Sequence, residues 1–136
     1  MEYIRENIIT SHSLHDMRAG AVDAEGDVVT LRLDGGLVRC AGCAEQVAGA
    51  VAFRGVDWDF CFVYILRGFT ANAGEFRGEK MALSEFIKRY PRFDFEIIDA
   101  CYGYNQTKLS GWLWDDELSE MTVEIYHAGD MVFIES

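Results

Sequence analysis

The 136-residue sequence has a single proline, no long apolar run and none of the short motifs that mark common enzyme active sites. With half of its residues hydrophobic and so little proline, the chain is not expected to be disordered. The longest apolar stretch, residues 60–66, is too short to cross a bilayer. Gly-x-Ser-x-Gly, the P-loop and a GxGxxG turn before a helix are missing, so binding is a better prediction than catalysis, and we expect no cofactor.

Positive charge is scarce, above all in residues 93–136. Ten Asp or Glu residues stand there against one basic residue, Lys108, so this stretch carries −9 of the chain's formal net charge of −11. An acidic surface repels nucleic acid and anionic lipid and attracts cationic partners. We therefore expect a protein partner of basic character, and neither nucleic acid nor a membrane.

The N-terminal segment, residues 1–7, has charges where a signal peptide requires an apolar run. This pattern predicts a cytoplasmic protein whose four cysteines are reduced. The length predicts one domain spanning residues 1–136.

Turn residues divide the chain into short segments with alternating apolar residues, which is typical of an antiparallel sheet. The first two strands should form a hairpin that turns at Glu25–Gly26 and ends at Gly35–Gly36, and the last four should form a meander that folds as a unit. The predicted fold class is α+β, a predominantly antiparallel sheet of about seven or eight strands with one short helix, which could be strongly curved. The predicted strands cover residues 16–24, 27–34, 46–54, 58–66, 93–104, 108–115, 120–127 and 130–135.

Two segments need separate interpretation. Residues 58–66 are apolar on both alternating faces, which predicts a central strand covered on both sides. Residues 40–52 fit either a helical stripe or, as we favour, a loop at 40–45 followed by a strand.

The one predicted helix spans about residues 80–90 and ends before Pro91. Apolar residues recur at helical spacing on one face, with Ser84 as the expected N-cap. The start is open between Glu79 and Ser84. The buried stripe would consist of Leu83, Phe86, Ile87 and Tyr90.

Two sets of metal-binding residue types occur. Cys40 and Cys43 form a CxxC, but a structural zinc site normally needs a second such pair, and incidental thiols in a loop are the simpler interpretation. His12, His15 and His127 could serve a small-molecule or metal-dependent enzyme. HxxH places both rings on one face only in a helix, however, and a strand is predicted to begin at Asp16.

Aromatic residues alternate in the predicted C-terminal hairpins. Core packing would explain them, but exposed Trp and Tyr are also typical anchors of protein interfaces. We expect Trp112 or Trp114 to be partly exposed, with the acidic turn at the rim. The predicted partner-binding residues are Trp112, Trp114, Asp115, Asp116, Glu117 and Tyr104.

Four segments carry a family resemblance: His15–Asp16, Val56 to Tyr64, Tyr102 to Asn105, and Gly129 to Met131. In these the chain resembles small uncharacterised bacterial sheet-rich proteins with an N-terminal His-Asp motif, some of them immunity-like. The resemblance implies an α+β sheet fold and no established activity.

Together these features predict an acidic protein-binding module, such as an immunity-type inhibitor of a basic partner. Neutralising Asp115, Asp116 and Glu117 should then slow association at low salt. The alternative is the enzyme that uses the three histidines, and a third possibility is a homo-oligomer that pairs sheet edges or apolar faces.

Overall fold

The computed structural model describes residues 1–5, 10–67 and 77–136. In these residues every paired strand is antiparallel to its neighbours, and all of the strands belong to one sheet of order β1-β11-β5-β4-β3-β8-β9-β10-β6-β7, with β2 beside β4. The strands are β1 (Glu2–Ile4), β2 (His12–Ser13), β3 (Arg18–Glu25), β4 (Val28–Arg39), β5 (Gln46–Phe53), β6 (Phe62–Arg67), β7 (Arg77–Ala82), β8 (Phe95–Gly103), β9 (Gln106–Trp114), β10 (Leu118–Tyr126) and β11 (Met131–Glu135). A 3-10 helix, η1 (Trp58–Phe60), and an α-helix, α1 (Leu83–Arg89), complete the described elements.

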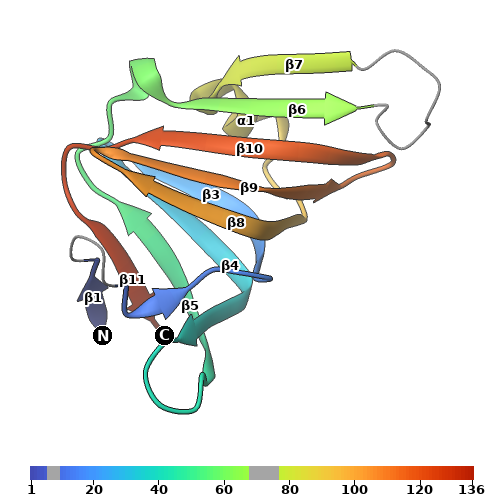
Figure 1. Cartoon of the computed structure of the whole chain (residues 1–136). Helices are drawn as coiled ribbons and strands as arrows, with labels where there is room; N and C mark the ends of the chain where they lie inside the picture. Colours follow the sequence, from blue (N-terminus) through green and yellow to red (C-terminus); the bar gives the residue numbers. More distant parts are fainter. Residues whose placement is uncertain (6–9, 68–76) are drawn as a thin grey trace.

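The sheet is strongly curved, and it folds over so that its two halves face each other (Figure 1). One wall contains β8, β9, β10, β6 and β7, and the other contains β3, β4, β5, β11 and β1. Helix α1 contacts β3, β6 and β7, so it closes the side where the two walls separate. The core lies between the walls.

The prediction of seven or eight strands is wrong, because the described residues form a sheet of eleven strands. The unpredicted strands are β1, β2 and β7, of three, two and six residues. The first two are too short to show an alternating pattern. The third, with the sequence RGEKMA, is largely polar because it lies at an edge of the sheet, where charged residues discourage further pairing.

Three local predictions also need correction. Residues 58–60 form η1 and not a strand, because Asp57 caps this turn by accepting a hydrogen bond from the Asp59 amide. The prediction that residues 58–66 form a central strand is also wrong, because β6 lies second from an edge of the sheet. Gly35–Gly36 does not end β4, which continues to Arg39 through an irregularity between Leu33 and Leu37.

The predicted C-terminal meander is correct for β8, β9 and β10, which pair in sequence order. Strand β11 leaves them and pairs with β5 and β1 in the opposite wall. The predicted loop at 40–45 is confirmed, and the strand predicted to follow it is β5.

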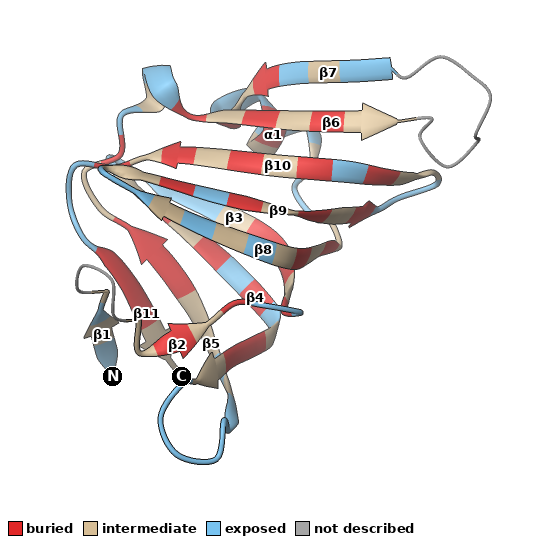
Figure 2. Cartoon of the chain, viewed as in Figure 1, coloured by how far each residue is buried: buried red, intermediate tan, exposed pale blue. Residues whose placement is uncertain are grey.

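Helix α1 ends before Pro91 as predicted, and it buries Leu83 and Phe86. Its N-cap is Ala82 and not Ser84, and this residue makes no side-chain capping hydrogen bond. The helix starts directly after β7, so pairing of that strand decides where it begins. In the sheet, buried and exposed residues alternate within single strands (Figure 2).

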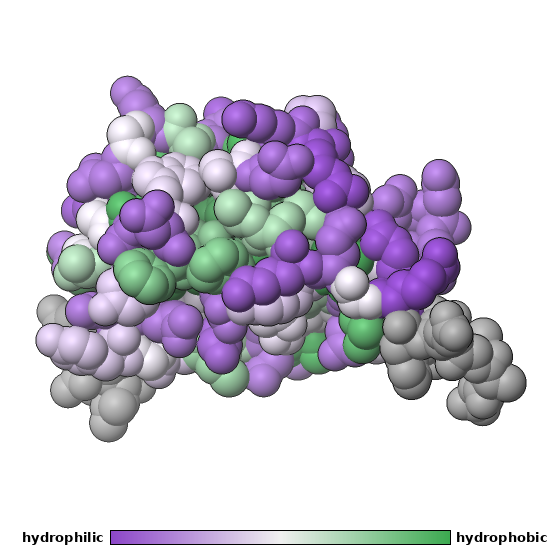
Figure 3. Space-filling model, turned by 90° about the horizontal axis from the view of Figure 1, so that it is seen from above, coloured by the Kyte–Doolittle hydropathy of each residue, from purple (hydrophilic) through white to green (hydrophobic). Residues whose placement is uncertain are grey.

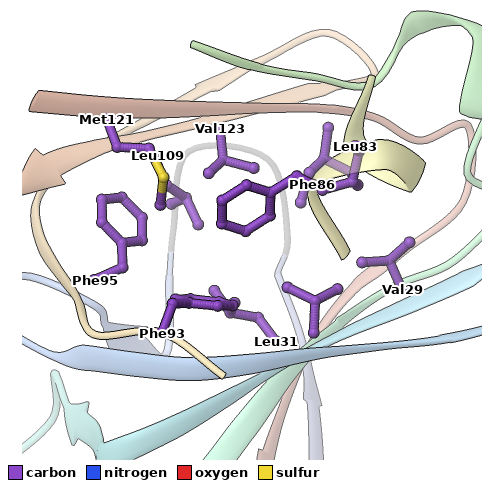
Figure 4. A pocket seen from close by; sticks show the side chains of 11 residues that line it. Val29, Leu31, Leu83, Phe86, Phe93, Phe95, Leu109, Met121 and Val123 are labelled. Atoms are coloured by element: carbon purple, nitrogen blue, oxygen red, sulfur yellow. The ribbon is translucent and has the colours of Figure 1, made fainter. Parts of the chain in front are cut away.

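The core between the walls is apolar. Side chains from β4, α1, β8, β9 and β10 point toward one another around a small cavity (Figure 4). The cavity volume is about 10 Å³, which is room for about one water molecule and too little for a larger ligand.

The outer surface above α1, β6 and β7 is partly hydrophilic, unlike the apolar core. Seen from above, apolar side chains gather near the middle of this face, and hydrophilic side chains surround them (Figure 3). The solvent side of α1 supplies polar residues to the molecule's surface, because Ser84, Glu85, Lys88 and Arg89 are exposed.

Candidate partner-binding site

The predicted aromatic and acidic residues meet where β9 turns into β10. Trp112 and Trp114 occupy the end of β9, and residues 115–117 form the turn. The expectation that an indole is partly exposed is confirmed, because Trp114 is 46 % exposed and Trp112 is intermediate. Trp112 lies in register between Glu96 and Glu120 on the neighbouring strands.

Trp114 is held in place by polar contacts on two sides. Its Nε1 donates a hydrogen bond of 3.3 Å to Glu96 Oε1. The guanidinium of Arg18 lies 5.6 Å from the centre of the indole ring, within the range of a cation–π interaction. The same Arg18 Nη1 donates to both carboxylate oxygens of Asp94, at 2.9 and 2.7 Å. The indole is therefore oriented without being buried.

Beside the indole lies a hollow of about 300 Å³, the Trp114 hollow, where chain segments from two places in the sequence meet. Aromatic rings and carboxylates line it together, which is the chemistry that recognises a cationic side chain. It is lined by Tyr90, Arg92, Phe93, Asp94, Leu113, Trp114 and Asp115.

Tyr90, Phe93 and Asp94 are site residues that the sequence prediction missed. They belong to the segment after α1, and the backbone amide of Trp114 donates to the Asp94 carbonyl at 2.8 Å. Their position beside Trp114 follows only from the pairing of β8 with β9.

The charge at the turn is only partly neutralised. Glu117 accepts a hydrogen bond of 3.4 Å from Arg77. Within the described ranges, neither Asp115 nor Asp116 forms an ion pair, and both are exposed. Their two negative charges are therefore available to a cationic partner.

Tyr104 does not share this surface. It is 92 % exposed in the turn between β8 and β9, at the other end of β9 from Trp114. Strand β9 has nine residues from Gln106 to Trp114, so its two ends lie roughly 25–30 Å apart. The structure thus separates the predicted binding residues into one cluster and one distant tyrosine.

The three histidines have separate surroundings. His127 is buried, its Nε2 hydrogen-bonded to Thr107 Oγ1 at 2.8 Å, and burial lowers its pKa. The exposed His15 contacts Asp16 and the carbonyl of Ile98. Across residues 1–5, 10–67 and 77–136, no three His, Cys, Asp or Glu side chains are grouped closely enough to hold a metal ion. Cys40 and Cys43 are free and exposed.

The buried His12 belongs to a network of polar side chains that also includes partly exposed residues. Its Nδ1 is 2.8 Å from Ser11 Oγ, and its Nε2 is 3.2 Å from Glu135 Oε1. Glu135 also accepts hydrogen bonds of 2.5 and 3.0 Å from Arg39. Serine, histidine and glutamate are residue types of hydrolase triads, but here Arg39 occupies the carboxylate and lowers the pKa of Glu135 to about 2. We interpret this network of polar side chains as structural, because it joins β2, β4 and β11.

This contact predicts a pH dependence of stability. Because the folded pKa of Glu135 is about 2 against an ordinary value of 4.5, its contribution is complete above pH 4.5 and is lost as pH falls toward 2. Glu135→Gln should therefore lower Tm at neutral pH, and the Tm difference from wild type should shrink to near zero by pH 2. Thermal unfolding between pH 2 and 7 measures this, with the exposed Glu120→Gln as control. A Tm difference that stays constant with pH would contradict it.

Comparisons with known proteins identify no relative. The chain matches no protein-family model, no curated protein sequence and no solved structure. Among the described residues, no helix has the length and apolar character needed to span a membrane. The functional argument therefore depends on the geometry of the chain itself.

Proposed function

We propose that this chain is a protein-binding module, and that its Trp114 surface receives a basic segment of a partner protein. The single observation that carries the proposal is the oriented, 46 % exposed indole of Trp114 beside Asp115 and Asp116, which form no ion pair with any described residue. Large aromatic side chains of this kind supply much of the binding energy at protein interfaces, and flanking carboxylates select cationic partners.

The contacts of Arg18 support this assignment. Its guanidinium pairs with Asp94 and lies over Trp114, so this ring and this carboxylate together already bind an arginine from the chain's own β3. An Arg or Lys of a partner would meet the same combination of ring and carboxylate at Asp115. An immunity-type inhibitor of a basic toxin, a role suggested for some of the proteins that the sequence resembles, would use such a surface to cover a cationic site.

Charge neutralisation at the turn tests the proposal. A partner is first captured on the immobilised chain from a bacterial lysate at low salt, and its association rate is then measured against variants. The double variant Asp115→Asn, Asp116→Asn should slow association by about tenfold at low salt and much less at high salt, because steering between charges is screened by ions. Trp114→Ala should chiefly accelerate dissociation.

The matched control is Glu25→Gln with Asp27→Asn. These two carboxylates are exposed at the β3–β4 turn, lie outside the Trp114 surface and give the same change in net charge. If the control variant slows association as much as the Asp115, Asp116 variant, net charge and not this surface governs binding. A partner whose kinetics ignore Trp114→Ala as well would refute the proposed function.

A further inference from the structure

Strand β8 lies in the interior of the strand order, between β3 and β9, yet part of its edge toward β3 is unpaired among the described residues. Strand β8 pairs with β9 along its length, from Phe95 to Gly103. On its other side it pairs with β3 only through Arg18–Glu96 and Ala19–Phe95. Beyond these pairs the two walls separate, so the second half of β8 has one neighbouring strand among the described residues.

The free backbone groups on this edge can be identified from the pairing. Gly103 and Gln106 close the two-residue turn as a hydrogen-bonded pair, so alternation directs the N–H and C=O of Tyr102 and Ala100 away from β9. A register shift between Ile97 and Asp99 resets the alternation, so the backbone of Ile97 also points away from β9, where it bonds to Met17 and Asp16. Within the described part of the chain, Ala100 and Tyr102 have no corresponding backbone partner on that side.

Strand β2 faces this edge from the opposite wall (Figure 2). It pairs with β4 through His12–Arg39 and Ser13–Val38, and the Cys40 amide donates to the Ser11 carbonyl. By the same alternation, the backbone N–H and C=O of His12 point away from β4. Two strand edges whose outward backbone groups pair with no strand among the described residues thus lie on either side of one opening.

The opening is a groove, the β8 groove. Ile98, Ala100 and Tyr102 line one side, and His12, Leu14 and Cys40 line the other, around a hollow of about 260 Å³. A second hollow of about 500 Å³ shares Thr10, His12 and Cys40 with it and extends toward Tyr3 and Arg39. The free part of β8 spans six residues, roughly 20 Å.

Two carboxylates lie at the rim of the groove. Asp99 is exposed and belongs to no ion pair among the described residues, and the side chain of Asp16 is 62 % exposed near the closed end. The groove walls themselves are mixed, since the apolar Leu14 and Ala100 line the groove together with the polar His12. An occupant with alternating apolar and basic residues would match both features.

We propose that the β8 groove binds an extended, basic peptide segment of a partner protein, which adds as a strand to the free edge of β8 at Ala100 and Tyr102. Strand addition satisfies the main-chain groups of the edge, while apolar side chains enter the hollow and basic ones lie beside Asp99 and Asp16. The proposal is independent of the Trp114 surface, since it involves a different strand edge and different contacts.

A phage-displayed library of random twelve-residue peptides is the probe. Peptides selected on the wild-type chain should alternate apolar residues with Lys or Arg. Ala100→Pro should weaken their binding about tenfold or more, because proline removes the N–H directed at the peptide and leaves the β8–β9 hydrogen bonds intact. Ala100→Ser keeps the N–H and should bind within a few-fold of wild type. Hydrogen exchange at the Ala100 and Tyr102 amides should slow when peptide binds.

Peptide chemistry supplies a second measurement that needs no folded variant. N-methylation at alternate peptide residues should abolish binding at the set of positions that faces β8 and leave the other set unaffected. Failure to enrich any peptide, equal binding to the Pro and Ser variants, or unchanged exchange at β8 would each overturn the proposal. A dimer of the wild-type chain that Ala100→Pro dissociates would overturn it in favour of pairing between two copies.

The two proposals can fail separately. Trp114→Ala should leave binding of the selected peptides unchanged, and Asp99→Lys should weaken it. If Trp114→Ala abolished peptide binding while Asp99→Lys did not, the peptides would occupy the Trp114 surface, and the β8 groove proposal would be wrong.

Discussion

Replacing Phe86 with alanine should lower the free energy of unfolding by about 3–5 kcal/mol. Phe86 is 1 % exposed in α1, and its ring centre lies 4.8 Å from that of Tyr90 and 5.2 Å from that of Phe93. It also borders the small cavity between the two walls, so truncation would enlarge an existing void that the paired strands cannot close. Urea unfolding followed by circular dichroism measures the change.

Two variants show whether the loss comes from packing. Glu85→Ala alters an exposed position in the same helix and should change stability by no more than about 0.5 kcal/mol. Phe86→Leu should restore part of the loss, because it refills some of the volume. A loss below about 1 kcal/mol for Phe86→Ala would mean that α1 does not close the core as the structure indicates.

Gly36→Ala should destabilise the protein by at least about 2 kcal/mol. Gly36 adopts a φ of 80° at the irregularity in β4, a conformation that L-residues with a side chain rarely adopt. In addition, a Cβ at this position would approach the Val47 carbonyl of β5 more closely than real Cβ atoms approach a neighbour. Either the β4–β5 pairing must shift or the clash must persist.

Gly42→Ala is the matched control. Gly42 has a similar φ of 70°, but no atom lies within 4 Å of a Cβ placed there. Its substitution should therefore have only the conformational cost of about 1 kcal/mol. Thermal unfolding of both variants separates the two effects, and equal losses would argue against the close β4–β5 contact.

The candidate site was predictable only in part. Alternation around Trp112 and Trp114, followed by three acidic residues, was enough to predict an exposed aromatic beside an acidic turn. Arg18, Tyr90 and Asp94 were not predictable, because they come from segments 20 to 96 positions away from Trp114. No local pattern encodes which of several polar residues a strand pairing will bring beside an indole.

The separation of Tyr104 has a similar cause. In sequence it belongs to the same series of alternating aromatics as Trp112 and Trp114. A hairpin, however, sends its turn to one end of the sheet and its strand termini to the other. Common composition therefore did not place these residues on one surface.

The sequence by itself determined the elements whose signals are local: the hairpin of β3 and β4, the strands β8 to β10, the end of α1 before Pro91 and the acidic C-terminal third. Tertiary structure alone decided that β1, β2 and β7 are strands, that β11 crosses to β5, and that β8 separates from β3 to leave an open edge. These features depend on contacts between residues far apart in the chain. The energy of a strand pair lies in its cross-strand neighbours, and these are known only when the chain has folded.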